Sequence, residues 1–518
     1  MTAGSPAEPV RRRTASAPDV LVVGLGPAGL VATRVLAAAG LRVHALEAGP
    51  ADPRRATSRS ALVAPAPTIA GRPDRPAPGP PAGLNAVGGA KQLAAAQSYR
   101  LDPWTHVARS ASLRRYGRDA LPAGSTVADW PLAAAELAPF HDRIEALLEV
   151  DGERAPDERD APPLAPPRAR GDWTARMADA ARDRGWRPFA APATRTPDAR
   201  GLLDPVRGRD QLTVETGAAA TALLLGPDGD VVGVRVRRGS VEREHRARTV
   251  VLAGGVPENV RLLLLAATAG GPGGAALGRH FMAHNLLAVH GWFPGEDLGR
   301  DAGTAAEATA VAELDGDRFD HAGLGFLGGS IVQAAMSGPR GMAWRTGVAA
   351  SLADPDAPPE LRARDGIDRH GASIGTVWAQ PEQLPRDDHR LELDGRRRDP
   401  LGRPVLLIHH GLADDDRRRA AFLMARMAEW LRAAGAARTW AAPPAPQPLG
   451  THLYGGTRMG ADPATAVVDG HGVAHGAPGL VVLGSSTFPT SGGRGPTQTI
   501  EALAWRAARR RAALLREG

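Results

Sequence analysis

The chain has 518 residues, of which 43% are hydrophobic and 23% charged, so it is long enough to bury the core of more than one domain. Its formal net charge of +7 comes almost entirely from arginine, which alternates with Asp and Glu and forms no aromatic-studded basic stripe, and this excludes a nucleic-acid-binding function. The absence of cysteine excludes disulfides, thiolate metal sites and iron–sulfur clusters.

No uninterrupted apolar run reaches the ~18 residues that a membrane span needs. The first 18 residues contain three consecutive arginines but no apolar signal-peptide core. We therefore expect a cytoplasmic protein with no membrane span and with a disordered leader over 1–18.

The first predicted elements are a buried parallel strand over 19–23, a glycine-rich turn and a helix over 30–39. In such a turn Gly24 permits the tight bend, Gly26 lets the backbone approach a pyrophosphate, and Gly29 allows the helix to pack closely on the strand. The helix N-terminus supplies N–H groups and the positive end of a dipole for the phosphates. The same spacing also occurs in a purely structural turn, which is the alternative.

A second strand over 41–47 completes a βαβ unit and ends at Glu47. A carboxylate at this position accepts hydrogen bonds from an adenosine ribose and repels a 2′-phosphate, which disfavours NADP. The strand, turn, helix and Glu47 together favour a dinucleotide site over the structural turn.

The rest of the chain alternates between regular elements and loops rich in Pro and Arg. We predict an irregular segment over 50–82, a helix over 132–148, strands with a hairpin turn over 212–236, a buried strand over 249–255 and a helix over 258–266. Short alternating segments at 390–393 and 405–408, followed by a long helix over 415–434, indicate a second, sheet-based domain before the chain returns at 449.

Segments along nearly the whole chain resemble the glucose–methanol–choline (GMC) oxidoreductase family. They are Gly24–Gly29 with Glu47, Gly88-Gly89 with Arg100, Asp129–Phe140, Val250–Leu264, Leu277–His284, His452–Gly460, Val467–Asp469 and Phe488–Thr497. The resemblance implies an α/β fold with a Rossmann-like FAD-binding domain built from discontinuous segments and an inserted α+β substrate domain with an antiparallel sheet. We expect the leader over 1–18, the FAD-binding domain over 19–300 with irregular or cap segments at 50–82 and 101–211, the substrate domain over 301–448, and a return to the FAD-binding domain over 449–518.

The resemblance also implies which residues bind the flavin. They are Gly24, Gly26, Pro27, Ala28, Gly29, Glu47, Ala48, Gly88, Gly89, Lys91, Ala220, Ala253, Gly254, Gly484, Ser485, Pro496 and Thr497. Pro496 and Thr497 are expected to open a helix whose N-terminus faces the N1/O2 edge of the flavin, although an ordinary proline-started helix has the same pattern. Some relatives bond the flavin to a histidine shortly after the Gly-Gly pair. The stretch 90–94 holds no histidine, so we expect noncovalent FAD, and we expect no metal.

By motif position, His452 is the base that takes the proton of the substrate hydroxyl, a task that suits a neutral imidazole. A buried structural histidine is the alternative for His452 and the preferred interpretation of His284. Relatives have His or Asn where this chain has Gly495. Either His452 works alone, or Arg494 or a substrate-domain side chain assists it, or catalysis is weakened.

The segments 452–459, 484–490 and 390–405 resemble the sugar- and polyol-oxidising branch, which includes gluconate-type dehydrogenases and pyranoside or glycoside 3-oxidising enzymes. We therefore expect an FAD-dependent oxidoreductase that removes hydride from a secondary or primary alcohol of a sugar, glycoside or cyclitol-like substrate. Oxygen, a quinone or a separate redox protein is the expected electron acceptor. The alternatives are a dehydrogenase for a non-sugar alcohol in specialised metabolism and a flavin-binding protein with weakened catalysis.

Overall fold

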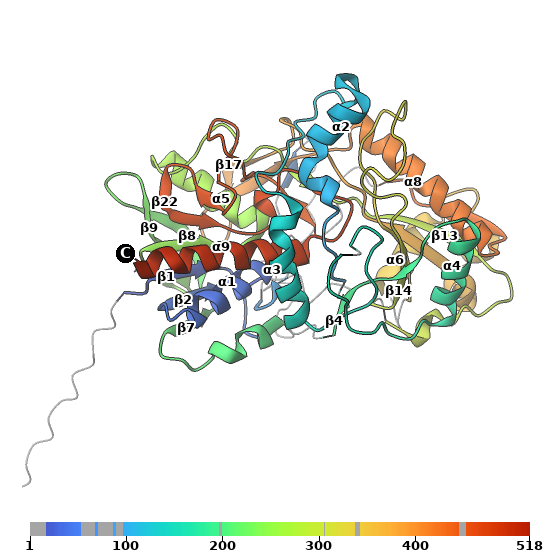
Figure 1. Ribbon diagram of the computed structural model, residues 1–518, viewed down its shortest axis with the longest axis horizontal. Helices are drawn as coiled ribbons and strands as arrows, with labels where there is room; N and C mark the ends of the chain where they lie inside the picture. Colours follow the sequence, from blue (N-terminus) through green and yellow to red (C-terminus); the bar gives the residue numbers. More distant parts are fainter. Residues whose placement is uncertain are drawn as a thin grey trace, which may run out of the picture.

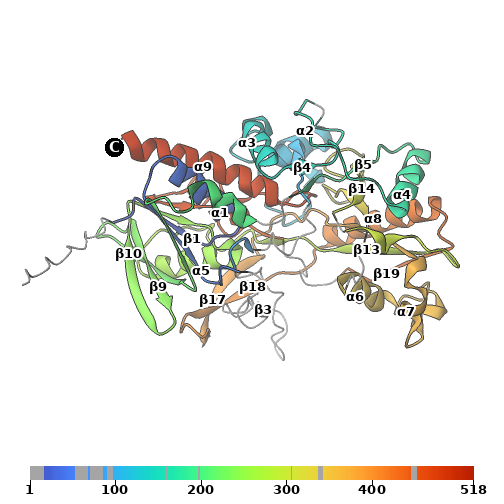
Figure 2. The same ribbon diagram turned by 90° about the horizontal axis from the view of Figure 1, so that it is seen from below.

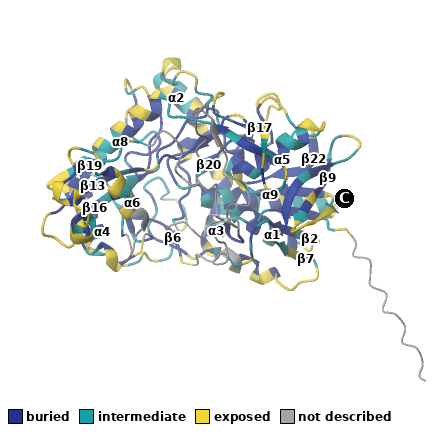
Figure 3. Cartoon of the chain, turned by 180° about the vertical axis from the view of Figure 1, so that it is seen from behind, coloured by how far each residue is buried: buried dark blue, intermediate teal, exposed yellow. Residues whose placement is uncertain are grey.

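The computed structural model describes residues 17–52, 68–70, 86–89, 97–158, 160–195, 199–304, 306–336, 342–444 and 452–517. The described residues form two lobes side by side, one built on a parallel sheet and one on an antiparallel sheet (Figure 1). The strands at the centre of both lobes are largely buried (Figure 3). Lys91 and most of the predicted irregular segment over 50–82 lie outside the described residues.

The parallel-sheet lobe is organised by a six-stranded sheet in the order β21-β22-β11-β1-β2-β7. Its strands are β1 Val20–Val23, β2 Val43–Glu47, β7 Leu212–Thr216, β11 Thr249–Leu252, β21 Val473–Ala474 and β22 Ala477–Val482. All but β21 run parallel, and every residue of β1 is buried, as the apolar runs predict. Because β22 pairs with β11, the end of the chain returns to the sheet that its beginning started.

Helices cover this sheet. They are α1 Pro27–Ala38, α3 Ala134–Leu147, α5 Gly255–Thr268 and α9 Thr497–Glu517. Helix α9 packs against both α1 and α3, so the C-terminal helix lies over the first βαβ unit (Figures 1 and 2). The predicted helices over 30–39, 132–148 and 258–266 are confirmed within a few residues. A smaller antiparallel sheet of β8 Ala219–Leu225, β9 Val231–Arg238 and β10 Val241–Arg246 contains the predicted hairpin turn.

The antiparallel-sheet lobe has six strands in the order β19-β13-β16-β15-β14-β5. They are β5 Phe189–Ala190, β13 Leu287–Trp292, β14 Ala308–Val311, β15 Val332–Ala335, β16 Ile374–Ala379 and β19 Arg438–Ala441. The apolar side chains of one face pack against α4 (Asp172–Asp183) and α8 (Asp414–Ala433), the predicted long helix. Helices α6 (Met342–Ser351) and α7 (Gly366–His370) lie on the other side of this sheet (Figure 2).

The two short segments predicted near 390 and 405 are strands, β17 Arg390–Arg398 and β18 Pro404–His409, but they do not join the antiparallel sheet. They form a separate sheet with β3 (Thr68–Ala70), and their apolar side chains pack against α5 of the parallel-sheet lobe. Two strands of the antiparallel sheet, β5 and β13, precede residue 301, where the substrate domain was expected to begin. The α/β fold class is confirmed, whereas the domain boundaries at 300 and 448 stay a prediction.

The remaining elements are short. They are β4 Val150–Asp151, β6 Ala193–Thr194, β12 Met282–Ala283, β20 Leu453–Tyr454, α2 Ala108–Tyr116 and the 3-10 turns η3 Pro103–Val107, η4 Arg118–Ala120, η5 Ala199–Val206, η6 Arg300–Ala302, η7 Pro359–Arg362, η8 Gly371–Ser373 and η9 Ser485–Thr487.

Candidate active site

The glycine-rich turn between β1 and α1 leaves open space at one of its three glycines. A Cβ on Gly29 would lie 1.8 Å from the carbonyl oxygen of Gly24, so packing of the turn requires glycine there. Gly24 itself has φ +92° and no room for a side chain. A Cβ on Gly26, by contrast, would meet no atom of the described residues within 4 Å. Packing within the described part of the protein therefore does not require glycine at position 26. Close approach of a ligand to the backbone would explain why glycine is there.

The N-terminus of α1 opens onto the same space. Gly26 is the N-cap, Pro27 follows it, and among the described residues no side chain caps the helix and no acidic side chain lies in its first turn. The N–H groups of Ala28 and Gly29 therefore have no partner within the helix. An uncapped helix N-terminus facing open space fits a phosphate group.

Glu47 lies at the end of β2 beside this turn. Its Oε2 accepts from the N–H of Leu25 at 2.8 Å, and its Oε1 accepts from the N–H of Gly49 at 2.8 Å. Burial raises the pKa of Glu47, and the backbone donors of Gly49 and Leu25 oppose that shift. Because each carboxylate oxygen has a second lone pair, the group keeps the capacity to accept from ribose hydroxyls.

The other expected flavin-binding residues of the described chain fall into two groups. Ala48, Gly88, Gly89, Ala220, Ala253 and Gly254 belong to the parallel-sheet lobe. Of these, Gly88 donates its N–H to the Leu25 carbonyl at 2.8 Å, and a Cβ on Gly89 would lie 3.1 Å from the Cα of Gly26. Gly484 and Ser485 begin η9, and Pro496 and Thr497 begin α9. Lys91 lies outside the described residues.

His452 directly precedes β20, which pairs antiparallel with β12 in the register Ala283↔Leu453. A Cβ on Gly495 would lie 3.8 Å from the Cε1 atom of His452, so the imidazole faces the segment that leads into α9. Burial lowers the pKa of His452 to about 4. The imidazole is therefore neutral near pH 7 and able to accept a proton.

The register of β12 and β20 brings a second histidine to the base. The N–H of His284 donates to the His452 carbonyl at 3.0 Å, and the Nδ1 atoms of the two rings are 3.2 Å apart. The Nε2 of His284 lies 2.8 Å from the carbonyl oxygen of Gly492. Burial, with a smaller effect of His452, lowers the pKa of His284 to about 3. The family resemblance predicted a structural role for His284, and nothing in the spacing of positions 284 and 452 shows that they meet.

Arg494 is one of the sequence-predicted substitutes for the missing partner at Gly495. It is buried, and its guanidinium contacts carboxylates rather than His452. Its guanidinium donates to Asp315 at 2.6 Å, to Asp157 at 2.9 Å, to Glu158 at 3.1 Å and to Asp102 at 3.2 Å. All of its nitrogens are engaged, so the hypothesis that Arg494 assists His452 is wrong.

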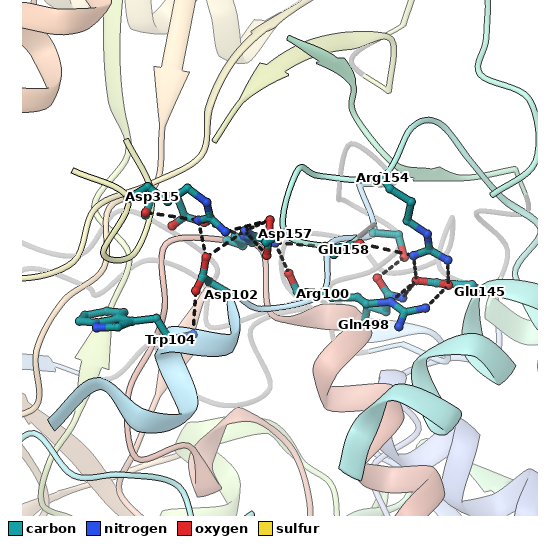
Figure 4. A network of polar contacts seen from close by, with 12 residues as sticks. Arg100, Asp102, Trp104, Glu145, Arg154, Asp157, Glu158, Asp315 and Gln498 are labelled. Atoms are coloured by element: carbon teal, nitrogen blue, oxygen red, sulfur yellow. Dashed lines mark hydrogen bonds and ion pairs between the residues drawn. The ribbon is translucent and has the colours of Figure 1, made fainter. Parts of the chain in front are cut away.

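The polar network around Arg494 continues to the first turn of α9 (Figure 4). Glu145 pairs with Arg100 and Arg154, and it accepts from the side chain of Gln498 at 2.5 Å. Burial raises the pKa of Glu158, within this network, to about 7. Since Arg494 and Gln498 lie on either side of Gly495 and Thr497, the network holds the segment beside His452 and the start of α9 in place.

The described residues hold neither a membrane-spanning helix nor a metal-binding cluster. None of their helices combines the length and apolarity needed to cross a membrane. They contain no cluster of three or more His, Asp or Glu side chains arranged to bind a metal ion.

Comparison with known proteins shows what this chain is similar to. A family model described as GMC oxidoreductase matches residues 385–504. The chain is 28% identical to 2-methyl-1,2-propanediol dehydrogenase of Mycolicibacterium austroafricanum over 94% of both chains. It is 25% identical to the gluconate 2-dehydrogenase flavoprotein of Pantoea cypripedii over 94% of this chain and 92% of that one. It is 28% identical to C-glycoside 3-oxidase of Microbacterium trichothecenolyticum over 95% and 96%.

Solved structures show the same fold at lower sequence identity. Pyridoxine 4-oxidase from Mesorbium loti superposes with a TM-score of 0.59 at 18% identity, covering 95% of this chain and 99% of that chain. Formate oxidase of Aspergillus oryzae RIB40 superposes with a TM-score of 0.61 at 15% identity, covering 95% and 98%. The chain is an alcohol oxidoreductase that is similar to the GMC oxidoreductases, and the family model matches its residues 385–504.

Proposed function

We propose that this chain is an FAD-dependent oxidoreductase that removes hydride from an alcohol carbon of a sugar, glycoside or cyclitol-like substrate, with His452 as the general base. One observation carries the proposal. A neutral imidazole lies beside the segment that opens α9, where a Cβ on residue 495 would be 3.8 Å from His452 Cε1.

The residues present fit FAD. The open space at Gly26 and the uncapped start of α1 suit the pyrophosphate, and Glu47 suits the adenosine ribose. The start of α9 supplies N–H groups and a helix dipole for the pyrimidine edge of the flavin ring. When bound, FAD supplies the hydride acceptor.

His452 would take the proton of the substrate hydroxyl while the carbinol hydrogen leaves as hydride. A positioned general base contributes about 10²–10⁴-fold to such a step. Gly495 supplies no second hydrogen bond to the developing alkoxide, and loss of one such donor costs ~2.7–4 kcal/mol in other enzymes. The open position at 495 leaves room for substrate beside the base.

The relatives support two substrate classes. Gluconate 2-dehydrogenase and C-glycoside 3-oxidase are named for sugar-derived substrates, which favours the sugar or polyol class for this chain. The 2-methyl-1,2-propanediol dehydrogenase, which matches 94% of both chains, favours a small non-sugar alcohol as the second candidate.

The test is anaerobic flavin reduction by a panel of sugars, glycosides, cyclitols and branched diols, followed by reoxidation with oxygen or a quinone. His452→Ala should slow the reduction by at least ~10²–10⁴-fold with FAD still bound, because the base is lost. His370→Ala removes an imidazole from α7 in the other lobe and is the control. If His452→Ala reduces flavin as fast as the parent, the base lies elsewhere; if no alcohol reduces the parent, the chain is a flavin-binding protein with weakened catalysis.

We also propose that the FAD is noncovalent, because no histidine occurs between Gly89 and Arg100. Acid precipitation of the purified holoprotein should release the yellow flavin into the supernatant. Flavin that stays in the washed, denatured pellet would show a covalent bond instead.

A further inference from the structure

A hydrogen bond joins the side chains of His284 and His452, and the two atoms it joins are both Nδ1. The Nδ1 of His284 and the Nδ1 of His452 are 3.2 Å apart, and the rings meet edge-on with centroids 5.3 Å apart. A hydrogen bond between two imidazole nitrogens needs a proton on one and a lone pair on the other. The other contacts of His284 decide which ring carries that proton.

The carbonyl of Gly492 fixes the protonation of His284. A carbonyl oxygen only accepts, so the 2.8 Å contact requires the proton of His284 on Nε2. Because burial lowers the pKa of His284 to about 3, the ring is neutral and carries one proton. Its Nδ1 is therefore a lone pair, and the proton between the two rings belongs to His452.

Tyr454 also contacts His284 and does not change this result. Its hydroxyl oxygen lies 3.1 Å from Nε2 and 3.3 Å from Nδ1 of His284. If the hydroxyl accepts, it accepts from Nε2–H, its shorter contact, and leaves the Nδ1 lone pair to His452; if it donates, it shares the Nδ1 lone pair with the Nδ1–H of His452. Both arrangements keep the proton of His284 on Nε2.

We infer that His284 is a positioning residue for the reaction: it holds the proton of His452 on Nδ1 and so leaves Nε2 as the unprotonated nitrogen that accepts the substrate proton. This inference rests on the proposed role of His452. The side chain of His284 is also the one among the described residues that hydrogen-bonds the imidazole of His452, so it sets the orientation of the ring as well as its tautomer.

The arrangement has a consequence for pH dependence. When His452 takes a proton on Nε2, its Nδ1–H becomes a charged donor to His284, and such bonds are stronger than neutral ones. The acceptor therefore favours the protonated form and raises the pKa of His452 relative to a site without it. Among the described residues, the other titratable groups facing the pair are Tyr454 and, beyond it, Glu382, whose pKa burial raises to about 8, so both are largely neutral near pH 7.

The test compares two variants of nearly the same shape in the FAD-loaded enzyme. His284→Asn keeps an acceptor oxygen near the position of Nδ1, whereas His284→Leu has none. We expect His284→Leu to slow flavin reduction on the order of tenfold, the loss of about 1.4 kcal/mol of stabilisation. The acidic limb of its pH profile should shift to lower pH, because the protonated form of His452 loses its acceptor.

We expect His284→Asn to restore both the rate and the position of the acidic limb. Flavin content and thermal midpoint are measured for both variants, so that a purely structural loss, which lowers the two variants alike, is recognised. A His284→Leu enzyme with the parent rate and pH profile would overturn the inference, as would equal loss in both variants.

A second measurement does not depend on activity. Nitrogen NMR of the ¹⁵N-histidine-labelled parent distinguishes the two tautomers, with signals assigned by His452→Ala and His284→Asn. We expect His452 with its proton on Nδ1 and His284 with its proton on Nε2, and the same tautomers in Tyr454→Phe. A proton on Nε2 of His452 in the parent contradicts the inference. If instead His452→Ala reduces flavin at the parent rate, the proposed base is wrong, whatever the tautomers.

Discussion

At the scale of single residues, the site differs from the sequence-based hypotheses in the neighbours of His452. Gly495 supplies no side-chain partner, as the sequence indicates. Arg494 is bound to buried carboxylates, and His284 contacts the Nδ1 atom of His452. The space beside Gly495 is free enough for ordinary van der Waals contact between a Cβ and His452. A larger side chain at this position therefore tests whether the missing partner limits the reaction rate or whether the space is needed to admit bulky substrates.

We expect Gly495→Asn to keep or raise the rate of flavin reduction by small alcohols, because an added amide can hydrogen-bond the substrate hydroxyl and a Cβ there would be 3.8 Å from the imidazole. Bulky glycosides should react more slowly, because the side chain occupies their space. Reduction rates at saturating substrate are the measurement, with Gly495→Ala as the control that adds only the Cβ. A loss of rate with small alcohols in both variants would show that the position tolerates no side chain.

At the scale of elements, the glycines of the turn into α1 have different roles. Two are required by packing of the protein itself, and one leaves space that suits a ligand. Gly29 is required because the helix crosses the turn at contact distance, whereas no neighbouring atom in the described part of the chain requires glycine at position 26. Gly26 also has φ −71°, which any residue adopts without strain.

The two substitutions should therefore act differently. Gly26→Ala should leave the thermal midpoint of the apoprotein unchanged and weaken FAD binding, since the methyl group projects into the proposed pyrophosphate space. Gly29→Ala should lower the midpoint of the apoprotein itself, because its Cβ would lie 1.8 Å from a backbone oxygen. Calorimetry of the apoproteins and fluorescence titration with FAD measure the two effects. Unchanged FAD affinity in Gly26→Ala would place the pyrophosphate elsewhere.

At the scale of the whole molecule, a buried ionic network joins distant parts of the chain around Arg494 (Figure 4). Its carboxylates come from segments near residues 102, 157 and 315, and Arg318 adds a second cation beside Asp102. Burial raises the pKa of Asp315, and Arg494 opposes that shift. The guanidinium therefore offsets several buried negative charges at once.

Arg494→Met should lower the free energy of unfolding by about 3–5 kcal/mol, because it leaves buried carboxylates without their cation. The matched control is Arg235→Met, which removes the cation of an exposed pair with Glu244 and should cost about 0–1 kcal/mol. Denaturant unfolding of both variants with the same FAD content gives the comparison. Equal losses in the two variants would mean that the network does not stabilise the fold.

Much of the fold could be predicted from local patterns. The apolar run, the glycine spacing and Glu47 specify a βαβ unit, because each of these signals depends on neighbours within a few residues. The motif at 452 and the proline-started helix at 497 likewise indicated which segments would meet. The separate sheet of β17 and β18 was not predictable, because alternation identifies a strand but not the strand or helix against which it packs.

The sequence by itself indicated the resemblance to GMC oxidoreductases, the elements of the parallel-sheet lobe and the candidate base that the resemblance implies, since these rest on residue types in short local segments. Only the tertiary structure decided that His284 meets His452 and that Arg494 is held by buried carboxylates. Both results come from long-range pairing: the register of β12 with β20 sets residue 284 opposite residue 452, although 168 positions separate them. Such a register follows from how the whole chain packs, and no local spacing encodes it.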